Sequence, residues 1–126
     1  MREAKIEAYL VEQIHLLGGT AEKFVSVGKR GVPDRLVCWP LDMVAARFWK
    51  TTPAMPHMEF IETKAPGGKL SVPQIRDHAK RRAMGFLVHV IWTKEQANTY
   101  LESRGKAFIT VNPPGYAEYL RSRSKP

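Results

Sequence analysis

Apolar residues recur along the chain with the periods of helices and strands, and these periods predict the elements of the fold. A first helix is predicted over residues 3–17 by four apolar positions at helical spacing, namely Ile6, Leu10, Ile14 and Leu17. The pair Gly18-Gly19 ends that pattern. A second helix is predicted over residues 72–84, with Ser71 as its N-cap and Pro73 in its first turn, and a third over residues 94–103.

Strands are predicted where short runs are rich in apolar and β-branched residues and are bounded by glycine or proline. These runs cover residues 23–27, 35–39, 58–64 and 86–92. The order is helix, strands, helix, strand, helix. We therefore expect an α/β fold with a mixed central sheet flanked by helices and a helical crossover between two of its strands.

Two segments have no clear pattern. Residues 41–57 fit either a short helix or an extended hairpin, and we treat them as an insertion. Residues 105–126 form a C-terminal extension, in which Phe108 to Val111 are expected to add an edge strand and Tyr116 to Arg123 a small helix. The expected organisation is one domain over residues 1–126, with its core at about residues 3–103.

Composition narrows the class of protein. No apolar run approaches the ~18 residues of a membrane span. The charged start of the chain does not fit a secretory signal, and the lone Cys38 cannot form an internal disulfide. We therefore expect a cytoplasmic protein without a membrane partner.

The charge balance indicates a polyanionic partner. The formal net charge is +8 and the isoelectric point is about 9.9. Excess positive charge of this size favours nucleic acid, although a basic domain with no nucleic-acid role has the same composition.

Carboxylates in two places supply candidate chemistry. Asp34 follows a Gly-Val-Pro turn, and Glu62-Thr63-Lys64 ends an apolar run. Because strand side chains alternate, Glu62 and Lys64 are expected on one face and Thr63 on the other. Burying an acid and a base costs desolvation energy, which a divalent cation and a phosphate group would offset. An aspartate at a turn or a lysine at a strand end is common by itself, so the prediction depends on the combination.

The order of these motifs resembles a known nuclease family. The segments that carry the resemblance are Lys29 to Arg35, Glu62 to Gly67, and Gln74 with His78. They are similar to the VRR-NUC family, the virus-type replication-repair nucleases of the PD-(D/E)XK superfamily. The likeness covers roughly residues 3–103 and implies a core like that of restriction endonucleases.

The resemblance also implies a metal site and its residues. It implies Mg²⁺ or Mn²⁺ held by Asp34, Glu62, the backbone carbonyl of Thr63 and a glutamate on the opening helix. We favour Glu7 over Glu3 for that glutamate because Glu7 borders the apolar stripe of the helix. Lys64 would position the attacking water or stabilise the phosphate charge, and the sequence does not choose between these roles. Gln74 is expected to donate to a phosphate or to a metal-bound water.

Basic residues near these motifs are the candidate DNA contacts. We expect the DNA-binding group to contain Lys29, Arg30, Arg35, Lys69 and His78. Contacts of this kind supply affinity and salt sensitivity without reading sequence.

The resulting hypothesis is a metal-dependent DNA endonuclease without a nucleotide cofactor. By resemblance it is a homodimer that cuts branched DNA such as four-way (Holliday) junctions, in a bacterial or phage-infected cell. The first alternative is a restriction-like or repair endonuclease that acts on duplex or flap DNA. The second is a non-catalytic, basic DNA-binding module on the same fold, which the complete set of acids and the lysine disfavours.

Overall fold

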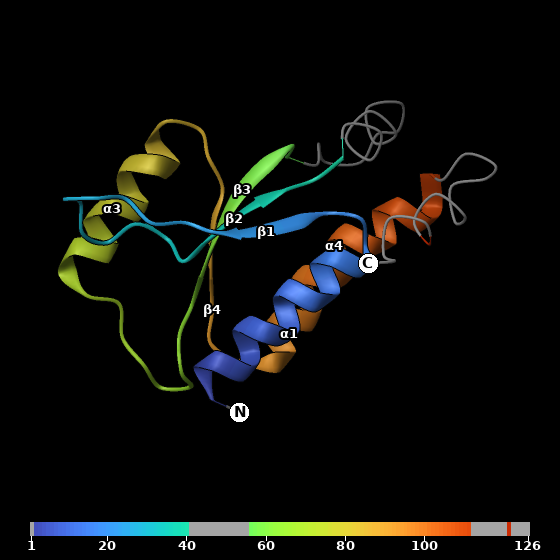
Figure 1. The fold of residues 1–126 in the computed structure, drawn as a ribbon, viewed down its shortest axis with the longest axis horizontal. Coiled ribbons are helices and arrows are strands. Elements are labelled where there is room, and N and C mark those ends of the chain that lie inside the picture. Colours follow the sequence, from blue (N-terminus) through green and yellow to red (C-terminus); the bar gives the residue numbers. More distant parts are fainter. Residues whose placement is uncertain (1, 41–55, 112–120, 122–126) are drawn as a thin grey trace.

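The computed structural model describes residues 2–40, 56–111 and 121, with side chains up to residue 104 and at 121. A four-stranded sheet forms its centre, and helices cover both faces (Figure 1). The predicted α/β fold with a mixed central sheet is confirmed. Most of the 41–57 insertion and the small helix expected near the C-terminus lie outside the described residues.

The sheet has the strand order β1-β2-β3-β4, in which only the β3–β4 pair is parallel. The strands are β1 (Thr20–Lys23), β2 (Arg35–Cys38), β3 (Met58–Thr63) and β4 (Val88–Ile91). The helices are α1 (Glu3–Leu16), α3 (Val72–Ala83) and α4 (Lys94–Val111). Helix α3 is the crossover that a parallel pair of strands requires.

The main apolar core lies between the sheet and helices α1 and α4. Three of the four predicted stripe residues, Ile6, Leu10 and Ile14, are buried, and Ile6 and Ile14 have no exposed surface. The fourth, Leu17, is half-buried and caps the helix, which ends at Leu16. The three buried residues pack in one cluster with Ile61 of β3 and Leu101 of α4. Burial of this stripe supplies the free energy that holds α1 on the sheet.

Helix α3 packs on the opposite face of the sheet (Figure 1). There Phe60 of β3 contacts the rings of Phe24 and Phe86. The guanidinium group of Arg81 lies 4.9 Å from the ring centroids of both Phe24 and Phe60. Because successive strand residues alternate, Phe60 and Glu62 share this face while Ile61 faces α1 and α4.

A buried carboxylate, Glu59, joins β3 to helix α4. Arg104 of α4 donates two hydrogen bonds to Glu59, at 2.9 and 2.7 Å. Three other groups bond it at 2.6–2.7 Å, in Trp39, Tyr100 and His89. Burial alone would raise the pKa of Glu59, but the hydrogen bonds from His89 and Arg104 and the Arg104 charge outweigh it and lower that pKa to about 2.

The structure corrects two predicted elements. The first strand occupies Thr20–Lys23 rather than residues 23–27, because its pairing with β2 begins directly after Gly19. Phe108 to Val111, expected as an edge strand, continue helix α4 to Val111. None of the helices in the described ranges has the combined length and apolar character needed to cross a membrane.

The Glu59 network predicts a large stability change on neutralisation. Glu59→Gln should lower the free energy of unfolding by about 3–5 kcal/mol, because Arg104 would keep a buried charge without a partner. Denaturant unfolding followed by circular dichroism measures this change. The exposed Glu12 is the matched control, and Glu12→Gln should change the free energy by less than about 0.5 kcal/mol. Equal effects of the two substitutions would contradict this role of Glu59.

Candidate active site

The sheet register brings the two separate acidic motifs together. Arg35 of β2 pairs with Ile61 of β3, so Asp34 lies beside the end of β3. The Asp34 Oδ2 atom accepts hydrogen bonds from the Thr63 backbone N–H at 2.9 Å and from the Thr63 hydroxyl at 3.1 Å. These two hydrogen bonds fix the Asp34 carboxyl group against β3. The alternation of strand side chains placed Thr63 on the face opposite Glu62 but did not predict that its hydroxyl group would bond to Asp34.

Glu62 is 2% exposed and faces helix α3. The Gln74 side-chain amide donates to Glu62 Oε2 at 3.3 Å. Gln74 is also part of a capping box, in which its own side-chain oxygen accepts from Ser71 N–H and its backbone N–H donates to Ser71 Oγ. The capping interaction that starts the helix therefore also orients the Gln74 amide towards Glu62.

The surroundings of the Glu62 carboxyl group favour its neutral form over its charged form. Burial is the largest cause, and the neighbouring Asp34 adds to it through a hydrogen bond and through its charge, so the pKa of Glu62 rises to about 8. The Lys64 charge acts in the opposite direction, and the Glu3 charge raises the pKa further. Lys64 and Glu3 are thus near enough to influence this acid.

The donor set suits a divalent cation. Glu62 Oε1 is buried and has no hydrogen-bond partner among the described residues. Two adjacent carboxyl groups that repel each other are stabilised when a hard cation binds their oxygen atoms. Asp34 and Glu62 could therefore hold Mg²⁺ or Mn²⁺.

A glycine turn sets the position of Asp34. Gly31 has φ +84°, in the left-handed region. A Cβ atom at this position would lie 2.2 Å from the Pro73 carbonyl oxygen. The chain before Asp34 can therefore pack directly against the first turn of α3, where Gln74 also lies, only because residue 31 has no side chain.

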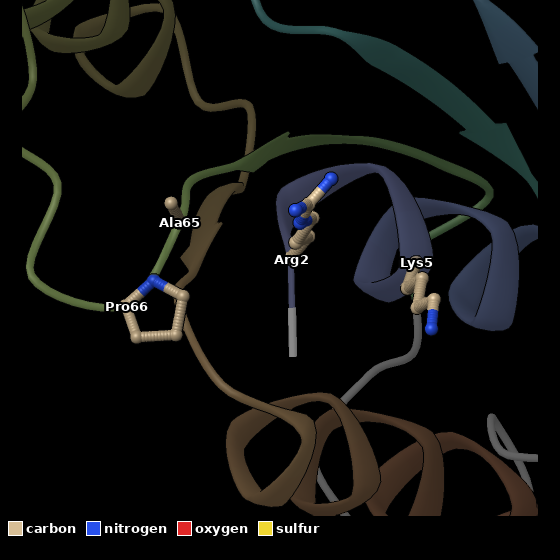
Figure 2. A pocket seen from close by; sticks show the side chains of 4 residues that line it. All are labelled: Arg2, Lys5, Ala65 and Pro66. Atoms are coloured by element: carbon tan, nitrogen blue, oxygen red, sulfur yellow. The ribbon is translucent and has the colours of Figure 1, made fainter.

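A basic cleft lies next to Lys64. It has a volume of about 570 Å³ and is lined by Arg2, the N-cap residue of α1, by Lys5 of α1, and by Ala65 and Pro66, which directly follow Lys64 (Figure 2). The loop after Lys64 is tied down by a hydrogen bond from Trp92 Nε1 to the Gly68 carbonyl, at 2.7 Å. We did not predict Arg2 and Lys5 as site residues. The sequence could have indicated them, because they lie on either side of Glu3 in the chain and are about one helical turn apart.

Comparisons with known proteins show which proteins the chain is similar to. No protein-family model matches the chain. The chain is 42% identical, over 91 residues, to "Putative nuclease p44" of Acyrthosiphon pisum secondary endosymbiont phage 1, and the match covers 72% of this chain and 83% of that protein. A solved structure described as a VRR_NUC domain superposes with a TM-score of 0.64 and 27% identity, over 79% of this chain and 94% of that one.

The chain belongs to the VRR-NUC family of nucleases. Its α/β core is the restriction-endonuclease-like fold of that family. This confirms the family and the fold class expected from the motifs.

In this VRR-NUC nuclease, the structure separates the two candidate glutamates of α1. Glu7 accepts a 2.8 Å hydrogen bond from Arg35 Nε, which neutralises its charge. The described residues contain no group of three histidine, cysteine, aspartate or glutamate side chains placed to hold a metal, so neither Glu7 nor Glu3 completes such a group with Asp34 and Glu62. Glu3 is exposed in the first turn, and its charge acts on Glu62.

The expected DNA contacts also separate into two sets. Lys29, Arg30 and Lys69 are exposed around the site. Arg35 is partly buried, with Nε bonded to Glu7 and Nη1 bonded to the Ala21 carbonyl at 3.2 Å. The Nε and Nη1 groups of Arg35 therefore donate within the protein, whereas the sequence predicted that Arg35 would contact DNA.

His78 does not fit the expected DNA-binding role, because its side chain is fully buried. Its Nε2 atom lies 3.6 Å from Glu62 Oε1, and neither ring nitrogen has a hydrogen-bond partner among the described residues. Burial is the main cause that lowers the pKa of His78, and the Arg82 charge adds to it. A neutral imidazole therefore packs behind Glu62.

The Gly31 turn predicts a difference between two glycines. Gly31→Ala should lower the free energy of unfolding by about 3 kcal/mol or more, since it adds both a left-handed strain and a clash with Pro73. Gly28 is the matched control, with φ +75° and nothing within 4 Å of a Cβ atom. Gly28→Ala should cost only about 1 kcal/mol. Denaturant titration of both variants tests the contact, and equal losses would show that the packing against α3 is unimportant.

The raised pKa of Glu62 predicts a stability loss at high pH. The pKa is about 8 in the folded state against an ordinary 4.5, so stability is fully present below pH 4.5 and is lost as the pH rises towards 8. In chelator, the melting temperature should therefore fall between pH 6.5 and 8.5. Glu59 is ionised throughout this window because its pKa is lowered, and the ordinary pKa of 6.5 that His78 regains in the unfolded chain affects only the lowest part of the window.

Glu62→Gln should flatten that pH dependence, because glutamine has no proton to lose. Manganese should restore the melting temperature of the original protein at pH 8, since a cation binds the deprotonated carboxylate. Scanning calorimetry measures both effects. An unchanged slope in Glu62→Gln would assign the pH dependence to another group.

Proposed function

We propose that this VRR-NUC nuclease is a Mg²⁺- or Mn²⁺-dependent endonuclease that hydrolyses phosphodiester bonds in branched DNA, such as four-way junctions. The observation that supports metal dependence is the buried Glu62 carboxyl group beside Asp34, with one oxygen atom unpartnered in the described structure. An uncompensated buried acid of this kind is costly in a purely structural role.

In this proposal Asp34, Glu62 and the Thr63 backbone carbonyl hold the cation. Glu3 replaces Glu7 as the third acid, because Glu7 is paired with Arg35. When bound, the cation supplies Lewis-acid activation of water and neutralises charge on the phosphate. Gln74 keeps the Glu62 carboxyl group oriented through its hydrogen bond.

Lys64 acts beside this carboxyl pair. The Lys64 charge lowers the pKa of Glu62, and the two residues that follow it, Ala65 and Pro66, line the cleft together with Arg2 and Lys5. Two roles remain compatible with this position: stabilisation of the charge that develops on the scissile phosphate, and positioning of the attacking water. The cleft would hold the phosphate backbone next to the scissile bond.

The preference for branched DNA and the homodimer are proposed from the family resemblance. A two-fold dimer would present two active sites to a symmetric junction. Restriction-like cutting of duplex or flap DNA is the alternative with the same chemistry. A cleavage panel of linear, flap and four-way substrates, with Mg²⁺, Mn²⁺ or chelator, separates these possibilities. Sedimentation of the protein alone and with a junction measures the oligomeric state.

Variants of the same protein test the residue roles in this panel. Asp34→Ala and Lys64→Ala should lower the cleavage rate at least about 100-fold while DNA binding persists. Glu3→Gln should lower it similarly, whereas Glu7→Gln should mainly reduce stability, by about 1 kcal/mol, through its partly exposed ion pair. Full activity of Asp34→Ala would refute the proposed site, and a selective loss in Glu7→Gln would return Glu7 to the metal site.

A further inference from the structure

A second basic cleft lies on the α3 side of the acid pair. Its volume is about 230 Å³, and its lining residues come from the loop before Asp34 and from α3. Four of them are cationic, namely Lys29, Arg30, Arg76 and Lys80, and the other two are Pro73 and Asp77. Lys29 and Arg30 were expected as DNA contacts from the sequence, whereas Arg76 and Lys80 of α3 join them only in the folded structure.

The acid in this cleft leaves most of the positive charge around it unbalanced. Asp77 is 4% exposed and accepts a 2.7 Å hydrogen bond from Arg81 Nε, with a second from Arg81 Nη2. Its remaining ion pair is with Lys29, at 3.6 Å. The negative charge of Asp77 is therefore already balanced by Arg81, which lies outside the lining of the cleft.

Three cations remain without an ion pair in the described part of the chain, namely Arg30, Arg76 and Lys80. Arg76 and Lys80 are both exposed and lie one helical turn apart on α3. Like charges at this spacing repel each other and destabilise a helix. An anion bound between them would remove that repulsion, and a phosphate group is an anion that arginine binds through paired hydrogen bonds.

The walls of the cleft are fixed relative to the acid pair. The loop is held against α3 by the close approach of Gly31 to Pro73 and by the Lys29–Asp77 ion pair. The same loop continues to Asp34, and the same helix presents Gln74 to Glu62. A phosphate in this cleft would therefore sit at a fixed distance from the scissile phosphate.

We infer that the cleft of Lys29, Arg30, Arg76 and Lys80 binds a backbone phosphate of the DNA substrate, flanking the phosphate that is cut. This inference rests on the proposed nuclease function. DNA would then be gripped from two sides of the acid pair, at this cleft and at the cleft of Arg2 and Lys5. Phosphate contacts at the two clefts would place one phosphodiester bond over Asp34 and Glu62 without any contact that reads the DNA sequence.

Binding measurements test the inference separately from catalysis. The double variant Arg76→Gln/Lys80→Gln and the control Lys23→Gln/Lys94→Gln each remove two exposed positive charges. Both are placed in an Asp34→Asn background and titrated with a labelled four-way junction across a salt series. The cleft variant should weaken binding by about tenfold and lower the salt slope by about 1–2, while the control changes affinity less than about twofold. Equal effects of the two variants would overturn the inference.

A methylphosphonate scan identifies the contact as a single phosphate. Replacing one linkage at a time along the strand removes one charge, and at one or two positions it should weaken binding by the protein with an intact cleft. The cleft variant should be insensitive at those same positions. Equal sensitivity at every position would show that the cleft does not bind a DNA phosphate.

The two proposals fail in different ways. Loss of binding in the cleft variant, together with no cleavage by the unmodified protein under any metal condition, would reject the catalytic proposal alone. Cleavage by the unmodified protein, with the cleft variant and the control indistinguishable in binding, would reject the cleft alone. Melting temperatures of all variants confirm that the surface substitutions leave the fold intact.

Discussion

The contact between the Glu62 and Asp34 carboxyl groups is the constraint around which the site is arranged. It exists because β2 and β3 are antiparallel with Arg35 opposite Ile61, which brings two acids from distant parts of the chain to one end of the sheet. Strand β3 holds another buried glutamate, Glu59, only three residues earlier on the opposite face. Hydrogen bonds and an arginine charge lower the pKa of Glu59 to about 2, whereas burial beside a second acid raises that of Glu62 to about 8. The satisfied acid joins helix α4 to the sheet, and the unsatisfied one has the environment of a functional group.

Helix α3 connects the fold to this chemistry. Its N-terminal capping box uses Gln74, whose side-chain oxygen caps the helix while its amide nitrogen reaches Glu62. The first turn also receives Gly31, so the loop before Asp34 and the helix beside Glu62 are held by one contact. One turn further along, His78 closes the space behind Glu62. The first two turns of α3 therefore contact both the loop that leads to Asp34 and the end of β3 that contains Glu62.

Charge is distributed in a way that suits a nuclease of this family. The net charge of +8 is consistent with a DNA partner, and two clefts have basic linings, one that includes the residues directly after Lys64 and one that includes the loop before Asp34. Positive charge around an acidic centre attracts the DNA backbone while leaving the centre itself available to a cation. Arg35 and Arg104 show that not every cation has this role, because each is used inside the protein to neutralise a glutamate.

The sequence by itself determined the elements whose signals are local and the family to which the chain belongs. The stripe of α1, the cap at Ser71 and the pattern of β3 are visible in residues close together in the chain, so periodicity and turn residues were sufficient to find them. Only the tertiary structure decided which side chains meet. The preference for Glu7 over Glu3 rested on one helix face, whereas the position of Arg35 on a strand far along the chain decides that Glu7 is paired. The burial of His78 and the network around Glu59 likewise depend on how helices pack on the sheet. Short segments of sequence do not predict how the helices pack on the sheet, because that packing arises from contacts between residues far apart in the chain.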